Sequence, residues 1–199
     1  SDRNNGGARI TTLGYTHRFQ DDSRWTTQLR HGGYERDLRA SAEGGSGGFG
    51  ASMNAQHYTT DNYRRNNRAE QDAVSGEFRI GGRDEFISLD LGGDTHKARL
   101  PGARSEAQLA SAPQDASTPN DYMNTRSQIV ALRGEKRLGE LTLALDLGHR
   151  EKTVRFYNDF GGGFDSRQDT GVRVNSIGPR LLWAGDLGAM KNRLALGFD

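Results

Sequence analysis

The sequence contains no cysteine, no long hydrophobic run and no excess of charge of either sign. Without cysteine the chain has no disulfide framework, no thiolate metal site and no cysteine nucleophile. No stretch of about 18 apolar residues is present, so no transmembrane helix is encoded. The 27 basic and 26 acidic residues are interspersed and give a net charge of +1. This distribution excludes the clustered basic surface that nucleic acids require.

Hydrophobic residues are also few. They make up 33% of the 199 residues, 27 further residues are glycine, and the mean hydropathy is −0.84. An ordinary soluble domain is nearer half apolar when glycine is counted. Such a composition fits either a disordered chain or a structure whose interior is water rather than a packed core. The apolar residues here are regularly spaced, which favours the second.

The clearest spacing is in the segment 141–149. Leucine occupies every second position from Leu141 to Leu147, and Thr142, Ala144 and Asp146 lie between. A period of two places the leucines on one face of a β-strand and the other residues on the opposite face. Weaker alternation of the same kind recurs along the chain, and we count about nine strands.

The connections between these strands alternate in length. Short turns are expected near 45–48, 81–84, 138–140 and 185–191, and long loops near 59–72, 92–125 and 150–170. A transmembrane β-barrel has short periplasmic turns, long extracellular loops, a lipid-facing apolar side and a polar lumen. We therefore predict an all-β fold, an antiparallel transmembrane β-barrel segment of about nine strands. The alternative from the residues is a soluble β-sandwich or repetitive adhesin, with disorder third.

No motif indicates catalysis or a bound cofactor. The five histidines lack metal-ligand spacing, no serine lies in a nucleophile elbow, and the carboxylates are scattered. The segment Gly45–Gly50 fits G-x-G-x-x-G, but a strand rather than a helix follows it, so it indicates a tight turn. We predict no catalytic residue, no metal site and no cofactor, and hence no enzyme.

Two polar segments are candidates for ligand binding. The first carries Phe156, Tyr157, Phe160 and Phe164 in an expected outward loop, and exposed aromatic rings often mark recognition surfaces. These rings would alternatively pack within the loop or lie in an interfacial aromatic girdle. The second, 63–68, has three arginines, including Arg64 and Arg65. Arginine suits carboxylate or phosphate groups of a ligand, or lipopolysaccharide; the alternative is a solvated charged loop.

Four short segments resemble the TonB-dependent outer-membrane receptors of Gram-negative bacteria. Residues 32–38, Gly-Gly-Tyr-Glu-Arg-Asp-Leu, look like the first extracellular loop after the plug. Residues 61–67 are similar to the family's DGYRxNN segment, although Asn62 replaces the usual glycine. Residues 99–102 and 117–122 look like the long loop that follows. In order, the likeness covers about residues 25–199.

The resemblance implies a 22-stranded barrel that holds an N-terminal plug and imports scarce ligands with energy passed through TonB. Residues 25–199 would be part of that barrel, and residues 1–24 the end of the plug or a disordered edge. The plug, its TonB box and the C-terminal strands would lie outside this chain. The alternation still running at its last residues fits such a fragment.

The implied role is energy-coupled uptake across the outer membrane of a Gram-negative bacterium, with a ferric siderophore as the expected ligand. Implied partners are TonB through the missing plug, the lipid bilayer, lipopolysaccharide and a small metal chelate. Ligand contacts are expected from the three long loops, so Tyr122 joins the aromatic and arginine candidates. A passive porin or structural outer-membrane barrel is the alternative, ahead of the soluble adhesin.

Overall fold

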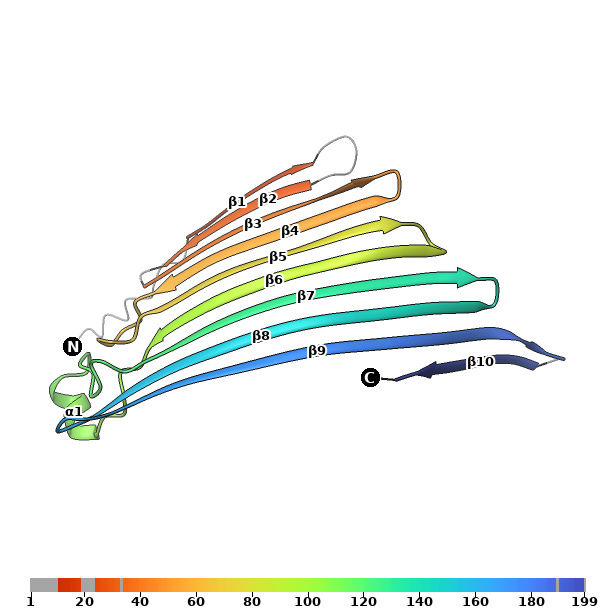
Figure 1. Ribbon diagram of the computed structural model, residues 1–199. Helices are drawn as coiled ribbons and strands as arrows, with labels where there is room; N and C mark the ends of the chain where they lie inside the picture. The colour runs from red at the N-terminus through yellow and green to blue at the C-terminus, as the bar shows by residue number, and fades with distance from the viewer. Residues whose placement is uncertain (1–10, 19–23, 33, 189, 199) are drawn as a thin grey trace.

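Ten antiparallel strands form one sheet in chain order, each hydrogen-bonded to the next (Figure 1). The computed structural model describes residues 11–18, 24–32, 34–188 and 190–198. The strands are β1 (Thr11–Arg18), β2 (Arg24–His31), β3 (Glu35–Ser46), β4 (Phe49–Thr60), β5 (Ala69–Gly81), β6 (Glu85–Arg99), β7 (Tyr122–Leu138), β8 (Leu141–Gly161), β9 (Phe164–Leu187) and β10 (Met190–Gly197). One short helix, α1 (Glu106–Ser111), lies between β6 and β7.

The register assigns opposite chemistry to the two faces of the sheet. Leu147 pairs with Leu132 on one side and Ile177 on the other, and the same row continues through Leu89 and Phe78. One residue along, the row on the opposite face contains polar or small residues: Glu43, Ser52, Glu77, Asp90, Ala131, Gly148 and Ser176. Because side chains alternate along each strand, these rows define an apolar face and a polar face.

Within the part of the chain that the structure describes, no second layer of protein covers either face of the sheet (Figure 1). Among the described residues, Ala144 is the one buried hydrophobic side chain, at 7% exposure, while Leu143, Leu145 and Leu132 remain more than 40% exposed. A single uncovered sheet has no packed core, which agrees with the low apolar content. The predicted antiparallel β-barrel segment is confirmed as a fold, and the sheet is open at β1 and β10.

Ten strands are present where about nine were expected. The additional strand is β1, which lies within the predicted N-terminal edge and pairs with β2 over its whole length, from Thr11 opposite His31 to Arg18 opposite Arg24. The proposed division of the chain after residue 24 stays a prediction.

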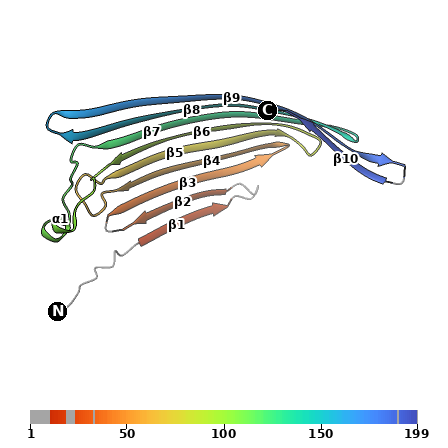
Figure 2. The same ribbon diagram turned by 90° about the horizontal axis from the view of Figure 1, so that it is seen from below.

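Connection lengths differ between the two ends of the sheet, as predicted. Residues 61–68 and 100–121 form long loops at one end, and short turns join the strands at the other (Figure 2). The turn between β3 and β4 consists of Gly47 and Gly48, with φ of 59° and 84°. Two consecutive positive φ values suit a tight hairpin turn and favour glycine at both positions.

The expected long loop over 150–170 is wrong. β8 and β9 continue through it as a paired hairpin and turn only at Gly161–Gly163 (Figure 1). The prediction assigned a loop because the segment is polar. Past the apolar part of a strand, however, the side chains on both faces can meet water, and backbone pairing continues without hydrophobic alternation.

Candidate functional site

The two long loops are joined into one unit at one end of the sheet. The Arg64 guanidinium donates hydrogen bonds to the carbonyl oxygens of Pro101, Gly102 and Asp115, at 2.9 to 3.2 Å. The backbone N–H of Arg65 donates to the carbonyl oxygen of Gln114 at 2.7 Å. Arg64 is therefore engaged with the backbone of the neighbouring loop, and its predicted ligand contact stays a prediction.

Asn66 makes the second connection between these loops. Its Nδ2 donates to the carbonyl oxygens of Leu100, Thr118 and Asp121 at 3.0, 2.6 and 3.1 Å. Its φ is 49°, and Asn62 has a φ of 54°. Asparagine tolerates this left-handed region better than most residues, which explains how Asn62 can take a position where the resembling family has glycine. Asn66 was not among the predicted site residues, which were chosen from this segment for the charge of its arginines.

The loop 100–121 is also anchored to the tip of the β8–β9 hairpin. Asp121, only 6% exposed, accepts a hydrogen bond from the backbone N–H of Asp159 at 2.7 Å. Asn120 Nδ2 donates to Asp159 Oδ2 at 3.0 Å. That bond, and one from the Gly161 N–H, hold the pKa of Asp159 below its ordinary value of 3.8.

Tyr122 and Tyr157, two of the predicted site residues, stack on each other. Their ring centroids are 5.6 Å apart with an interplanar angle of 15°. The Arg99 guanidinium lies 5.7 Å from the Tyr122 ring centroid, and Arg167 donates to the Tyr122 hydroxyl at 3.4 Å. Register places these four residues in one row on the same face as Leu147. Hydrogen bonding with Tyr122 raises the pKa of Arg167 above its ordinary value.

The other predicted aromatic residues lie apart from the pair of Tyr122 and Tyr157. Phe156 pairs with Met123 and lies on the polar face by the same alternation. Phe160 and Phe164 flank the hairpin tip and are 71% and 76% exposed. Arg65 points its side chain into solvent, 81% exposed, with Asp115 at 3.3 Å. The structure thus brings together Tyr122 and Tyr157 but does not gather all seven candidates into one site.

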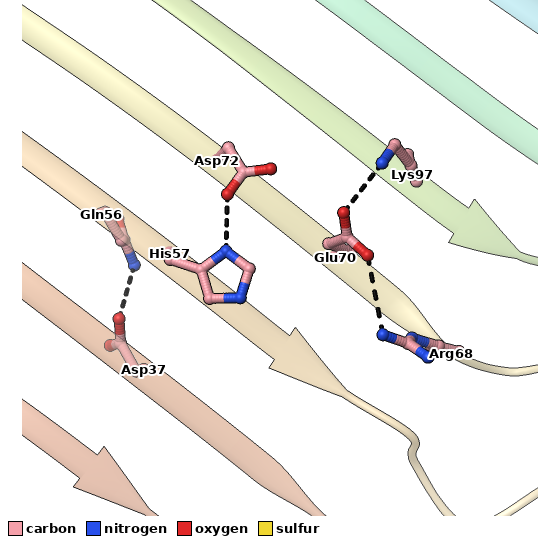
Figure 3. A network of polar contacts seen from close by, with 7 residues as sticks. All are labelled: Asp37, Gln56, His57, Arg68, Glu70, Asp72 and Lys97. Carbon is pink, nitrogen blue, oxygen red and sulfur yellow. Dashed lines mark hydrogen bonds and ion pairs between the residues drawn. The ribbon is translucent and has the colours of Figure 1, made fainter.

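Polar networks flank the loop end on both faces (Figure 3). On the polar face, buried Asp37 accepts from Gln56 at 3.0 Å and pairs with Arg39 at 2.8 Å. Arg133 and Arg180 both pair with Asp146 on that face, nearer the short turns. The polar face is therefore lined with paired charges and amides, which suits contact with water or a polar partner.

On the other face, charged residues follow directly after the apolar side chains. His57 Nδ1 lies 2.5 Å from Asp72, and Glu70 lies 2.8 Å from Lys97 and 3.7 Å from Arg68 (Figure 3). The hydrogen bond with Lys97 lowers the pKa of Glu70 below 4.5 and raises that of Lys97 above 10.5. A hollow of about 450 Å³ opens here, lined by Arg68, Glu70, Lys97, Ala98, Arg99, Tyr122 and Asn124.

No group of His, Asp or Glu that could hold a metal ion occurs among residues 11–18, 24–32, 34–188 and 190–198. α1 is neither long nor apolar enough to cross a membrane, and no other helix in the described chain is. The hydrogen bonds and ion pairs described above hold the two long loops together and line the two faces of the sheet.

Comparison with known proteins gives a likeness of fold. The structure superimposes on a crystal structure of the ferric citrate transporter FecA in its unliganded form with a TM-score of 0.72, over 94% of this chain and at 13% sequence identity. The chain spans 28% of the length of that transporter. The sequence matches no model of a protein family, and no curated protein matches it. The chain is thus an open segment of an antiparallel β-barrel with the fold of part of a known transporter.

Proposed function

We propose that this chain forms part of the barrel of an outer-membrane receptor that imports a scarce ligand with energy passed through TonB. The observation that carries the proposal is the fold match to a ferric citrate transporter over nearly the whole chain. The resemblance of the segments 32–38, 61–67, 99–102 and 117–122 to TonB-dependent receptors supports it. A ferric chelate is the ligand class, a siderophore or a citrate-type complex.

The two faces of the sheet support a bilayer location. Leucines at 141, 143, 145 and 147 share one face with Leu132 and Ile177, and none of the elements that the structure describes covers this face. In a barrel this face meets lipid, and the opposite face, with Asp37, Arg133 and Asp146, meets the lumen. A soluble adhesin would have to leave the same apolar surface in water.

The ligand would meet the barrel at the long-loop end. Phe160 and Phe164 at the hairpin tip and the Arg65 side chain supply exposed aromatic and cationic surface there, and Phe156 lies on the lumen-facing side. Replacement of the three phenylalanines by alanine in the complete receptor should weaken chelate binding about tenfold or more while the barrel still folds. Unchanged affinity would remove this hairpin from the ligand site.

The uptake role is tested in cells that carry the complete protein. Ferric citrate and a ferric siderophore, each labelled with ⁵⁵Fe, are offered to cells with and without functional TonB. Uptake that needs both the receptor and TonB is the expected result. Uptake of small solutes that continues without TonB would instead identify a passive porin.

A further inference from the structure

We propose that the hollow on the outward face of β5, β6 and β7 binds the phosphate group of a phosphorylated glycolipid in the outer leaflet. The hollow is lined by Arg68, Lys97 and Arg99 together with Glu70, Tyr122 and Asn124. The inference rests on the proposed function in one respect, because it takes the apolar face as the surface that meets lipid.

The hollow lies on the lipid-facing side of the sheet, beyond the apolar side chains. Along β6, Ile87, Leu89 and Leu91 are followed on the same face by Thr95, Lys97 and Arg99. A lipid whose acyl chains pack on the apolar residues therefore presents its headgroup to the cationic ones. This continuity favours a lipid over a soluble ion as the source of the phosphate.

The charges of the hollow are incompletely neutralised. Three cations line the hollow with one carboxylate, Glu70, which lies 2.8 Å from Lys97 and 3.7 Å from Arg68. Arg68 also lies 4.0 Å from the Asp61 carboxylate. Arg99 has no carboxylate partner within the described residues and lies against the Tyr122 ring. Arg126, exposed on the same face, also has no partner among them. Unpaired guanidinium groups suit phosphate, which they bind through two parallel hydrogen bonds.

Tyr122 and Tyr157 complete the headgroup site. An amphipathic ring with a hydroxyl is suited to the boundary between acyl chains and polar headgroups. The stack also holds Arg99 and Arg167 at its two ends. The arrangement supplies an aromatic surface for sugar rings and cations for their phosphates.

The test uses the complete receptor, purified and placed in phosphatidylcholine nanodiscs that contain a small fraction of bisphosphorylated lipid A. Lipid A retained per receptor is counted by native mass spectrometry. The double variant R68Q/R99Q should bind it about tenfold to thirtyfold more weakly, since each cation near an anionic lipid surface contributes roughly fivefold. R68K/R99K, which keeps both charges, should retain most of the binding and shows that the site still folds.

A matched control removes the same charge from the opposite face. R150Q/K152Q alters two exposed residues of β8 on the polar face, and its lipid A binding should stay within about twofold of the unchanged protein. Dephosphorylated lipid A should bind equally to R68Q/R99Q, to R150Q/K152Q and to the unchanged protein. Equal loss in R150Q/K152Q and R68Q/R99Q, or no preference for the phosphorylated lipid, would overturn the proposal.

The outcome is separable from that of the proposed function. A receptor that binds lipid A through Arg68 and Arg99 but imports no ferric chelate would contradict the uptake role and leave the lipid site standing. A receptor that imports a chelate through TonB but binds lipid A regardless of these arginines would do the reverse.

Discussion

Tyr122 and Tyr157 form the last residue pair of β7 and β8 at the long-loop end of the sheet, and their ring centroids are 5.6 Å apart. They lie directly opposite each other in the register, thirty-five positions apart in the sequence. The stack fixes the long β8–β9 hairpin beside the strand that leaves the loop 100–121. Its face is the one that carries the leucines, which separates it from Phe156.

The first prediction concerns this stack. Y122A and Y157A should each destabilise the complete barrel, and a double-mutant cycle should give a coupling of about 0.5–1.5 kcal/mol, the usual value for aromatic pairs. Urea unfolding in lipid vesicles measures it. Chelate affinity should be unchanged in Y157A, because its ring lies on the outward face. A loss of affinity as large as that of the phenylalanine variants would contradict the division of the aromatic residues.

The second prediction concerns Arg64. Lysine at this position has one point-like ammonium group and cannot reach the three carbonyl oxygens of Pro101, Gly102 and Asp115 together. R64K should release the loop 100–121 at a cost of about 1–3 kcal/mol in local docking free energy, the usual penalty for leaving polar groups unpaired. Hydrogen exchange of the Ser117 and Arg65 amides reports it.

R65K is the control for that variant. The Arg65 side chain is 81% exposed and has a single ion pair at 3.3 Å, so its replacement should change exchange in neither loop. Exchange in R65K as fast as that in R64K would show that the docking of the loops does not depend on the contacts of the Arg64 guanidinium.

The third prediction is a pH dependence at the hairpin tip. The folded pKa of Asp159 lies below its ordinary 3.8, so the carboxylate stabilises the docked loop fully above that value. The contribution is lost as the pH falls through the lower, folded pKa. A spin label on a single cysteine at Ala107, in α1, should become more mobile below about pH 4.

Because the chain has no native cysteine, that label is unique within it. D159N should make label mobility less dependent on pH, whereas D169N, which alters a carboxylate on β9 that faces Arg155, should not. A pH response that survives in D159N would assign the titration to another group.

The sequence predicted the sheet better than the loop site, for physical reasons. The leucine alternation of 141–147 identifies a strand and its apolar face from adjacent residues alone. Because each strand pairs with the next one in the chain, the order of the strands follows once the turns are found. The hairpin over 150–170 was missed because pairing of its backbone leaves no hydrophobic signature. Asn66 was missed because its role depends on carbonyl groups 34 to 55 positions away. Asp121 was missed because its role depends on a backbone amide 38 positions away.

The last prediction compares two neighbours on β7. Leu132 pairs with Leu89 and Leu147 on the apolar face, and Ala131 pairs with Asp90 and Gly148 on the polar face. An arginine on the lipid face of a barrel costs about 2–4 kcal/mol near the bilayer midplane, whereas one facing the lumen is solvated. L132R should therefore destabilise the complete protein in vesicles by about that amount, and A131R, beside the Asp90 carboxylate, by less than about 1 kcal/mol. Urea titration followed by tryptophan fluorescence gives both values. If the two variants are equally mild, both faces meet water, and the soluble β-sheet interpretation replaces the membrane barrel.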